Sequence, residues 1–360
     1  MSKPRSCAAL VALGLILAAC AGPPKKPLVD PFPLQFPLVE VAGLEIEGAV
    51  VGQPAARDGV VYYATDDGHL TAAVVPGCDI LWRFDAGRPF SGGPELGQDH
   101  IAVRDSAGTL YLLDKRGSLV FKSDLGPDLT TAVREDRGMI FFGTGDGRIA
   151  MLDPAAGGRV VWESRLEAPV SAGPGFAGDL VLFGTGDGRL LAVDRSGATV
   201  WAFSADGTVS ADVAVDADRL FFGTENRRFY CLNAKKGKTV WSRRLQGAPV
   251  HPAVVQDGTL ALPASNSVVY VLSRRGGSIL SWETVPSRVL FPLSFAAPSV
   301  LVTSMDASIV AFDISAGRRV GQHVAPGPLV AGAIWVPPFT VAFIEAQETG
   351  RQRMVVFRSR

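Results

Sequence analysis

Met139 to Asp153 reads MIFFGTGDGRIAMLD, and this stretch returns as LVLFGTGDGRLLAVD from Leu180 and as RLFFGTENRRFYCLN from Arg219. Each copy consists of an apolar run, a tight polar turn and a second apolar alternation. An Asp-Gly pair such as Asp146-Gly147 suits a two-residue β-hairpin, because such turns need positive φ angles. The sequence therefore predicts a hairpin that recurs along the chain.

The hairpin belongs to a repeat of about forty residues, the period typical of propeller blades. An earlier copy begins at Val60, and weaker copies run from Ile101 to Asp114, from Thr259 to Ser273 and from Ser299 to Asp313. After each hairpin comes a short strand with an aromatic residue, then a strand with small residues and often proline. Four short strands in each repeat, with frequent turns, indicate one blade of a β-propeller.

The aromatic position recurs at intervals of 39 to 41 residues. A seventh copy of the position falls at Gly321, where the aromatic side chain is lost. The six aromatic copies are Trp82, Phe121, Trp162, Trp201, Trp241 and Trp282.

The length of the chain gives the number of blades. Residues 38–360 amount to eight repeats of about forty residues each. After Pro328 the chain supplies three strands, expected near Leu329–Val336, Thr340–Ile344 and Arg353–Arg358, and Leu38–Glu47 can supply the missing outer strand. Such a closure hides two sheet edges. We therefore predict an all-β fold, an eight-bladed β-propeller of four-stranded antiparallel blades closed by strands from both termini over residues 38–360.

The N-terminus has the pattern of a processing signal. A basic start precedes an apolar run from Ala8 to Leu17, which is too short to cross about 30 Å of hydrocarbon as a helix. Leu17-Ala18-Ala19-Cys20 resembles the bacterial lipobox, which implies a signal peptide over residues 1–19 and an acylated Cys20. Ala21 in place of Asp implies export to the outer membrane. Six prolines in residues 23–37 predict a semi-rigid tether over residues 20–37.

Charge and composition argue against several function classes. Without the signal, the chain has 33 Lys and Arg against 35 Asp and Glu, so no basic excess favours nucleic acid. The four histidines have no metal-ligand spacing. Acids that recur at equivalent positions, such as Asp67, Asp146 and Asp187, indicate turn chemistry, because an active site breaks the symmetry of a repeat. We therefore expect no enzyme activity, no metal and no cofactor.

Two cysteines remain once Cys7 leaves with the signal and Cys20 is acylated. These are Cys78 and Cys231, which the repeat places on blades 1 and 5. Because those blades are roughly opposite each other, a disulfide between them is not expected. Cys231 is expected to be a small core residue.

The pattern of an aromatic residue, Gly-Thr, Asp-Gly, an apolar strand and then Val-Trp resembles the PQQ-like propeller repeat. The best copies run from Phe142 through Trp162, from Phe183 through Trp201 and from Phe222 through Trp241. The resemblance implies that the tryptophans dock adjacent blades, and it is not a mark of function. Quinoprotein dehydrogenases share the blade pattern but are longer and carry a vicinal Cys-Cys pair that this chain lacks, so that activity is a remote alternative.

A lipid-anchored, eight-bladed propeller of this type is similar to the BamB family of the outer-membrane barrel-assembly machine. The resemblance implies a periplasm-facing, non-catalytic scaffold on the outer membrane that binds the barrel-assembly core subunit and nascent barrel proteins. In that family a loop between blades 3 and 4 carries an apolar-Arg contact motif, whereas the junction here is short and lacks it. Four residues are carried over as a partner-binding rim, with solvated loop positions as the alternative: Arg165, Leu166, Asp206 and Asp212.

A second function class stays open. An envelope lipoprotein of this shape can act as a sensor or binding module that holds a small ligand or a polymer in the central channel. Blades 6 to 8 drift from the repeat, for example at Ala264–Ser267 and Gly321. The drift is compatible with a specialised face or with simple relaxation.

Overall fold

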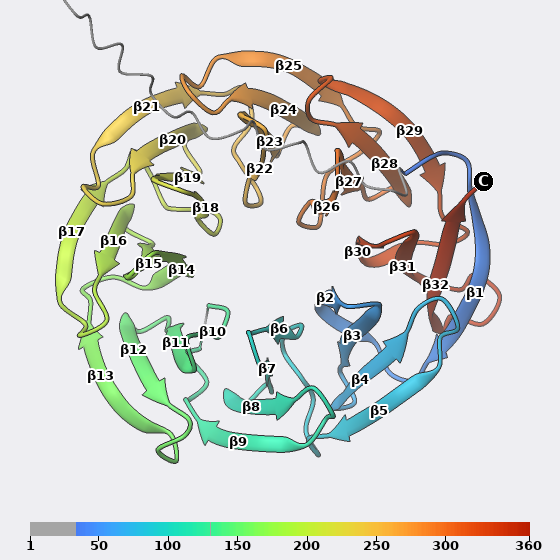
Figure 1. The fold of residues 1–360 in the computed structure, drawn as a ribbon, viewed down its shortest axis with the longest axis horizontal. Coiled ribbons are helices and arrows are strands. Elements are labelled where there is room, and N and C mark those ends of the chain that lie inside the picture. The colour runs from blue at the N-terminus through green and yellow to red at the C-terminus, as the bar shows by residue number, and fades with distance from the viewer. Residues whose placement is uncertain (1–33, 130) are drawn as a thin grey trace, which may run out of the picture.

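The eight blades form a closed ring. The computed structural model describes residues 34–129 and 131–360, and every helix or strand element assigned within them is a β-strand. The strands make eight four-stranded antiparallel sheets around a central channel (Figure 1). No helix in this part of the chain is long and apolar enough to cross a membrane. The predicted all-β, eight-bladed architecture is confirmed.

In each blade the first strand lines the channel, and the fourth lies on the outside of the ring (Figure 1). Blades 1 to 7 follow the chain order. Blade 1 contains β2 (Val50–Arg57), β3 (Val60–Thr65), β4 (His69–Val74) and β5 (Ile80–Asp85); blade 2 contains β6 (Glu95–Leu96), β7 (His100–Arg104), β8 (Thr109–Asp114) and β9 (Leu119–Asp124); and blade 3 contains β10 (Arg134–Asp136), β11 (Met139–Gly143), β12 (Arg148–Asp153) and β13 (Arg159–Arg165). Blade 4 contains β14 (Val170–Ala177), β15 (Leu180–Thr185), β16 (Arg189–Val193) and β17 (Thr199–Ser204), and blade 5 contains β18 (Ala214–Asp216), β19 (Arg219–Gly223), β20 (Arg228–Asn233) and β21 (Thr239–Arg244). Blade 6 contains β22 (Val254–Gln256), β23 (Thr259–Ala264), β24 (Val268–Ser273) and β25 (Ile279–Thr284), and blade 7 contains β26 (Ser294–Ala296), β27 (Ser299–Thr303), β28 (Ser308–Asp313) and β29 (Arg318–Val324).

Blade 8 is built from both ends of the described chain. Its inner strands are β30 (Leu329–Val336), β31 (Phe339–Glu345) and β32 (Gln352–Ser359), and its outer strand is β1 (Leu38–Ile46). The register of β1 on β32 runs from Leu38 opposite Ser359 to Ile46 opposite Gln352. The predicted closure is confirmed, and the strand bounds agree with the expected ones within about two residues, as is usual for assigned element ends. The expected signal peptide, Cys20 and most of the expected tether lie outside the described residues.

The core lies between the blades. The second and third strands of a blade are buried on both faces, as in Ile140 to Gly143 of β11, because a neighbouring sheet covers each side. Outer strands alternate instead between exposed and half-buried positions, as in β17. One buried cluster joins Leu112 of blade 2 to Phe142 of blade 3. Each blade therefore depends on its neighbours to cover its apolar faces.

The hairpin between the second and third strands is held by its threonine and aspartate. The Thr144 hydroxyl donates to Asp146 Oδ1 at 2.5 Å, and Gly147 has a φ of 87°. The same pair recurs as Thr185 with Asp187. The recurring acids act in turns, as their symmetry predicted. We call the side of the ring that carries these hairpins and the connections between blades the connection face.

Aromatic residues of the outer strands dock on glycines of the next blade. A Cβ added at Gly117 would come within 2.5 Å of the Trp82 ring, and the Trp82 indole N–H donates to the Lys115 carbonyl at 3.1 Å. The glycine is required there because only a residue without a side chain lets the ring approach so closely. Phe121 meets Gly158 without the hydrogen bond. The remaining pairs are Trp162 with Gly197, Trp201 with Gly237 and Trp241 with Gly277, with N–H to carbonyl distances of 3.0 Å.

Trp282 does not dock on the next blade, and its sequence assignment needs correction. Cys231 pairs with Trp241 in blade 5, whereas the equivalent Val271 of blade 6 pairs with Ser281. The docking position is therefore Ser281, whose hydroxyl faces Gly317. Trp282 lies one residue later, on the other side of the sheet, and is 61% exposed.

At Gly321 the docking arrangement is reversed: the glycine lies on blade 7, and the aromatic ring comes from the segment that enters blade 8. Gly321 pairs with Ala311 at the docking position, and a Cβ added there would come within 2.4 Å of the Phe36 ring. Phe36 lies just before β1 in the segment that enters blade 8. The aromatic that blade 7 lacks is thus supplied by the N-terminal segment.

Candidate functional site

Two of the four expected partner-binding residues lie together on the connection face. Arg165 ends β13, and its Nη2 lies 2.8 Å from Asp146 Oδ2 while its side chain is 71% exposed. Leu166 is half-buried, and its backbone N–H donates to the Gly147 carbonyl at 2.8 Å. The hairpin of blade 3 therefore holds the short junction between blades 3 and 4 in place.

Asp206 lies on the same face, one blade further along the ring. Its carboxylate accepts from Asn226 Nδ2 at 3.1 Å and lies 3.4 Å from Arg228 Nε. Asn226 and Arg228 belong to the hairpin of blade 5. Asp206 therefore borders an open hollow of about 480 Å³ on the connection face, which Arg227 and Arg244 also line.

Asp212 is not part of this rim but lies in the channel wall. One carboxylate oxygen lies 2.6 Å from Arg134 Nη2, and the other accepts from the Gly173 N–H at 2.8 Å. Its side chain points to inner strands because the connection turns inward before β18. The expectation that Asp212 shares a surface with Arg165 and Leu166 is not met.

Arg134 joins inner elements from four blades. It donates to the Pro174 carbonyl at 3.0 Å, and its Nε lies 3.6 Å from Glu95 Oε2. Burial opposes the charged form of Arg134, but the carboxylates of Asp212 and Glu95 outweigh it, so the pKa of Arg134 is raised. Burial raises the pKa of Glu95, while Arg134 acts in the opposite direction. The network fixes the relative positions of the inner strands.

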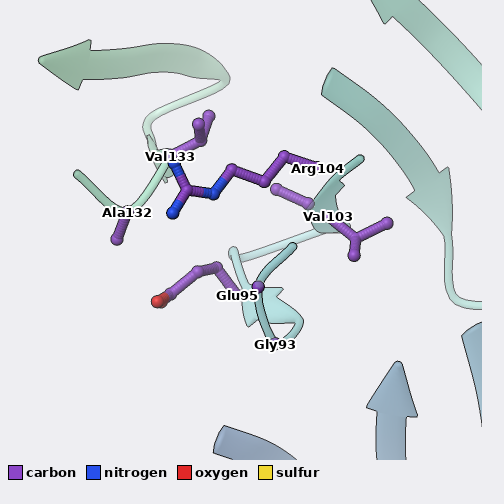
Figure 2. A pocket seen from close by; sticks show the side chains of 8 residues that line it. Gly93, Glu95, Val103, Arg104, Ala132 and Val133 are labelled. Atoms are coloured by element: carbon purple, nitrogen blue, oxygen red, sulfur yellow. The ribbon is translucent and has the colours of Figure 1, made fainter. Parts of the chain in front are cut away.

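A small hollow opens beside Glu95 between blades 2 and 3. Figure 2 shows the side chains of Arg104 and Glu95 both extending toward the segment of Ala132 and Val133. Arg104 donates to the Leu129 carbonyl, and burial lowers the pKa of Arg104. The hollow measures about 170 Å³, below the roughly 300 Å³ at which small-molecule pockets begin. It can hold water or one small polar molecule.

The described residues form no group of three His, Cys, Asp or Glu side chains arranged to hold a metal ion. Cys78 and Cys231 are free and buried. Burial raises the pKa of the Cys231 thiol to about 11, which disfavours the nucleophilic thiolate at neutral pH.

A charge asymmetry accompanies the rim, and the sequence interpretation based on net charge missed it. Residues 50–213, which form blades 1 to 4, have 14 Lys and Arg against 22 Asp and Glu. Residues 34–49 and 214–360, which form blades 5 to 8 including β1, have 17 Lys and Arg against 12 Asp and Glu. The ring is therefore acidic on one half and basic on the other. Counting charges by blade would have found this signal.

Comparison with known proteins agrees with this architecture. The model of the outer membrane protein assembly factor BamB family matches residues 77–195, 145–253 and 187–340 in overlapping copies, which together cover most of the ring. The chain belongs to the BamB family. Its blades 1 to 8 all contribute residues to the matched range.

Relatives within the BamB family are similar over parts of their length. The BamB of Nitrosomonas eutropha is 33% identical over 107 residues, which are 30% of this chain and 26% of that protein. The BamB of Shewanella oneidensis is 25% identical over 264 residues, which are 67% of this chain and 65% of that protein. The chain thus matches less than two thirds of the length of these relatives.

Solved structures share the fold. BamB from Moraxella catarrhalis superposes with a TM-score of 0.72 at 18% identity, covering 89% of this chain and 99% of that one. The quinohemoprotein alcohol dehydrogenase of Comamonas testosteroni superposes with a TM-score of 0.71 at 14% identity, covering 89% of this chain and 76% of that one. At these identities the similarity shows the fold alone.

Proposed function

We propose that this protein is a non-catalytic scaffold that assists the assembly and insertion of outer-membrane β-barrel proteins. The observation that carries the proposal is the BamB family match across residues 77–340, on a ring of eight closed blades. A rigid ring whose aromatic residues dock its own blades offers its surfaces, rather than a deep pocket, to other molecules.

The proposed contact with the barrel-assembly core subunit is made by the connection face. Arg165 reaches out from its pair with Asp146 and is mostly exposed, and Asp206 borders the neighbouring hollow. The Leu166 backbone hydrogen bond to Gly147 holds the junction with Arg165 in place without the longer loop motif of the family, and Asn226 holds Asp206. Pre-ordered contact residues reduce the entropy lost on binding.

The proposal includes no cofactor. The acids that a catalyst would use are engaged in hairpin turns, and the charged groups of the channel wall contact one another. These contacts favour the scaffold over the sensor that would hold a ligand in the channel. The similarity to a quinohemoprotein dehydrogenase extends to the fold only.

The proposed location is the periplasmic side of the outer membrane, with Cys20 as the lipid anchor. Replacing Cys20 with Ala should release the protein from the membrane fraction into the soluble periplasm. If the Cys20→Ala variant stays with the membrane, the anchor assignment is wrong.

A pull-down from detergent-solubilised envelopes tests the scaffold function. We expect the tagged protein to recover the barrel-assembly core subunit, and Arg165→Glu combined with Leu166→Asp to lose it. Lys122→Gln, on the outer strand β9, serves as the control and should retain it. Reproducible absence of the core subunit, together with normal porin levels in a deletion strain, would contradict the function.

A further inference from the structure

Trp282 breaks the symmetry of the ring on its outer surface. The residue that follows the docking position is polar or small in the six other blades where the outer strand follows the third along the chain. Those residues are Arg83, Lys122, Glu163, Ala202, Ser242 and Gln322. In blade 6 it is Trp282, which is 61% exposed. Tryptophan is enriched among the residues that carry binding energy at interfaces, so the exposed Trp282 is a candidate anchor for a ligand.

Trp282 borders a hollow of about 280 Å³ between blades 5 and 6. Tyr270 forms part of its floor and is 5% exposed, while Ile279 is 42% exposed at the edge. Arg244 lies at the connection-face end and also lines the larger hollow beside Asp206. The two hollows share Arg244, and together we call them the groove; the larger one is lined by Asp206 and Glu225 as well as by Arg227 and Arg244.

Arg244 lacks the carboxylate that its counterpart in blade 3 has. In blade 3, Arg148 pairs with Arg165 across two strands, and Arg165 contacts Asp146. In blade 5 the equivalent pair is Arg228 with Arg244.

The hairpin residue of blade 5 that corresponds to Asp146 is Asn226. Arg228 contacts Asp206, but no carboxylate of the described chain lies within 4.0 Å of the exposed Arg244 side chain. Arg228 and Arg244 lie opposite each other, and only Arg228 has a carboxylate partner among the described residues. This arrangement favours a ligand with an acidic group.

The surrounding blades carry the same sign of charge. Residues 214–288, which span blades 5 and 6, contain 11 Lys and Arg against 5 Asp and Glu. This local excess would attract an acidic partner and repel a basic one, and salt would weaken the attraction.

We propose that the groove between blades 5 and 6 binds an extended acidic polypeptide segment, with a large apolar side chain against Trp282 and an Asp or Glu against Arg244. Two concave hollows that share Arg244 suit a chain in extended conformation better than a flat lipid surface. The proposal does not rest on the assembly function, because peptide binding is tested on the purified protein without the core subunit.

The probe is a fluorescein-labelled ten-residue peptide of Gly, Ser and Thr that carries one Phe and, two residues later, one Asp. Binding to the purified protein is measured by fluorescence anisotropy at low salt. We expect saturable binding that Trp282→Ser and Arg244→Gln each weaken by about tenfold, a change typical of central interface residues. Exchanging the peptide Asp for Lys should have a similar effect.

Three further variants make the test specific. Lys122→Gln changes the position equivalent to Trp282 in blade 2, and Arg189→Gln removes a connection-face arginine that contacts Asp187. Both should leave binding within about twofold of wild type, the size expected of a rim residue. Asn226→Asp supplies Arg244 with the missing carboxylate and should weaken the Asp peptide but not a Ser version of it.

The proposal is overturned if the wild-type protein shows no saturable binding, or if the control variants weaken it as much as Trp282→Ser. It is also overturned if the Trp282-dependent binding is to phosphatidylglycerol vesicles and not to the peptide. Thermal unfolding of each variant checks folding. Asn226→Asp keeps the test decisive if Arg244→Gln proves unstable.

Discussion

The ring of Phe36 occupies the space above Gly321, so close that a Cβ on Gly321 would come within 2.4 Å of it. This contact replaces the aromatic docking residue that blade 7 lacks, and Phe36 packs beside the cluster that contains Leu34 and Phe357. The entering segment thereby takes part in the packing between blades 7 and 8.

Phe36→Ala should lower the free energy of unfolding by about 1–2 kcal/mol, because a half-buried aromatic contact is lost. Urea unfolding followed by near-UV circular dichroism measures the change. Gln35→Ala is the control, since the Gln35 side chain is exposed and its hydrogen bond to Ser359 uses the backbone N–H. Gly321→Trp should destabilise the wild type but partly rescue Phe36→Ala. Strictly additive effects of the two substitutions on the free energy of unfolding would contradict the reversed docking of Phe36 on Gly321.

Exchanging Ser281 and Trp282 should stabilise the ring. The double variant Ser281→Trp with Trp282→Ser places an indole opposite Gly317, where five other blade pairs have an aromatic residue facing a glycine. Burying the ring should raise the free energy of unfolding by about 1–2 kcal/mol. The melting temperature is the measurement, with Trp282→Ser alone as reference. A melting temperature of the double variant below that of Trp282→Ser would mean that the space beside Gly317 is too small for the indole ring.

Gly237→Ala should cost more than an ordinary glycine substitution. The added Cβ would come within 2.5 Å of the Trp201 ring at a φ of 63°. We expect a loss of about 2–4 kcal/mol from strain and overpacking together. Gly59→Ala separates the two, because its φ is 78° and nothing lies within 4 Å of the new atom; its loss should be about 1 kcal/mol. Equal losses in Gly237→Ala and Gly59→Ala would show that contact with the Trp201 ring adds nothing to the cost of replacing Gly237.

Acid should destabilise the turns of the blades that an aspartate holds in place. The Thr144 hydroxyl donates to Asp146 and lowers the pKa of that carboxyl, and Ser196 lowers the pKa of Asp194 in the same way. Because the folded pKa values lie below those of the unfolded chain, their contribution is present above pH 4 and is lost as the pH falls through the folded values. Unfolding midpoints between pH 6 and pH 2 measure the loss.

Thr144→Val provides the check on the Asp146 titration. Removing the donor should raise the pKa of Asp146 toward its ordinary value in a carbon-detected NMR titration. The pKa of Asp194, which belongs to another blade, should not move. An unchanged pKa of Asp146 would show that the hydroxyl is not the cause.

The blades were predictable from sequence because their signals are local. Hairpin turns, buried runs and a repeat of about forty residues recur often enough to fix the strands and their number. Trp282 was misplaced because the tryptophan of this outer strand lies one residue after the docking position, which Ser281 occupies opposite Val271. An even spacing of forty residues from Trp241 would have indicated Ser281.

Contacts between distant parts of the chain were not predictable in this way. Phe36 meets Gly321 only after the ring has closed, and Asp212 turns inward toward Arg134 on another blade. The basic half of the ring was within reach of the sequence, but a net charge near zero concealed it. That Arg244 lacks a carboxylate partner in the described chain could be recognised only from the strand register, which identifies Arg165 as its counterpart in blade 3.

The pairing of β1 with β32 also sets the order of events in biogenesis. Leu38 and Ser359 are separated by more than 300 residues, so the outer edge of the last blade stays incomplete until the final strand has been made. Until then the first strand has no partner on the ring, and its backbone groups remain open to other strands. Correct folding therefore requires that β1 does not pair with another strand before β32 has been synthesised.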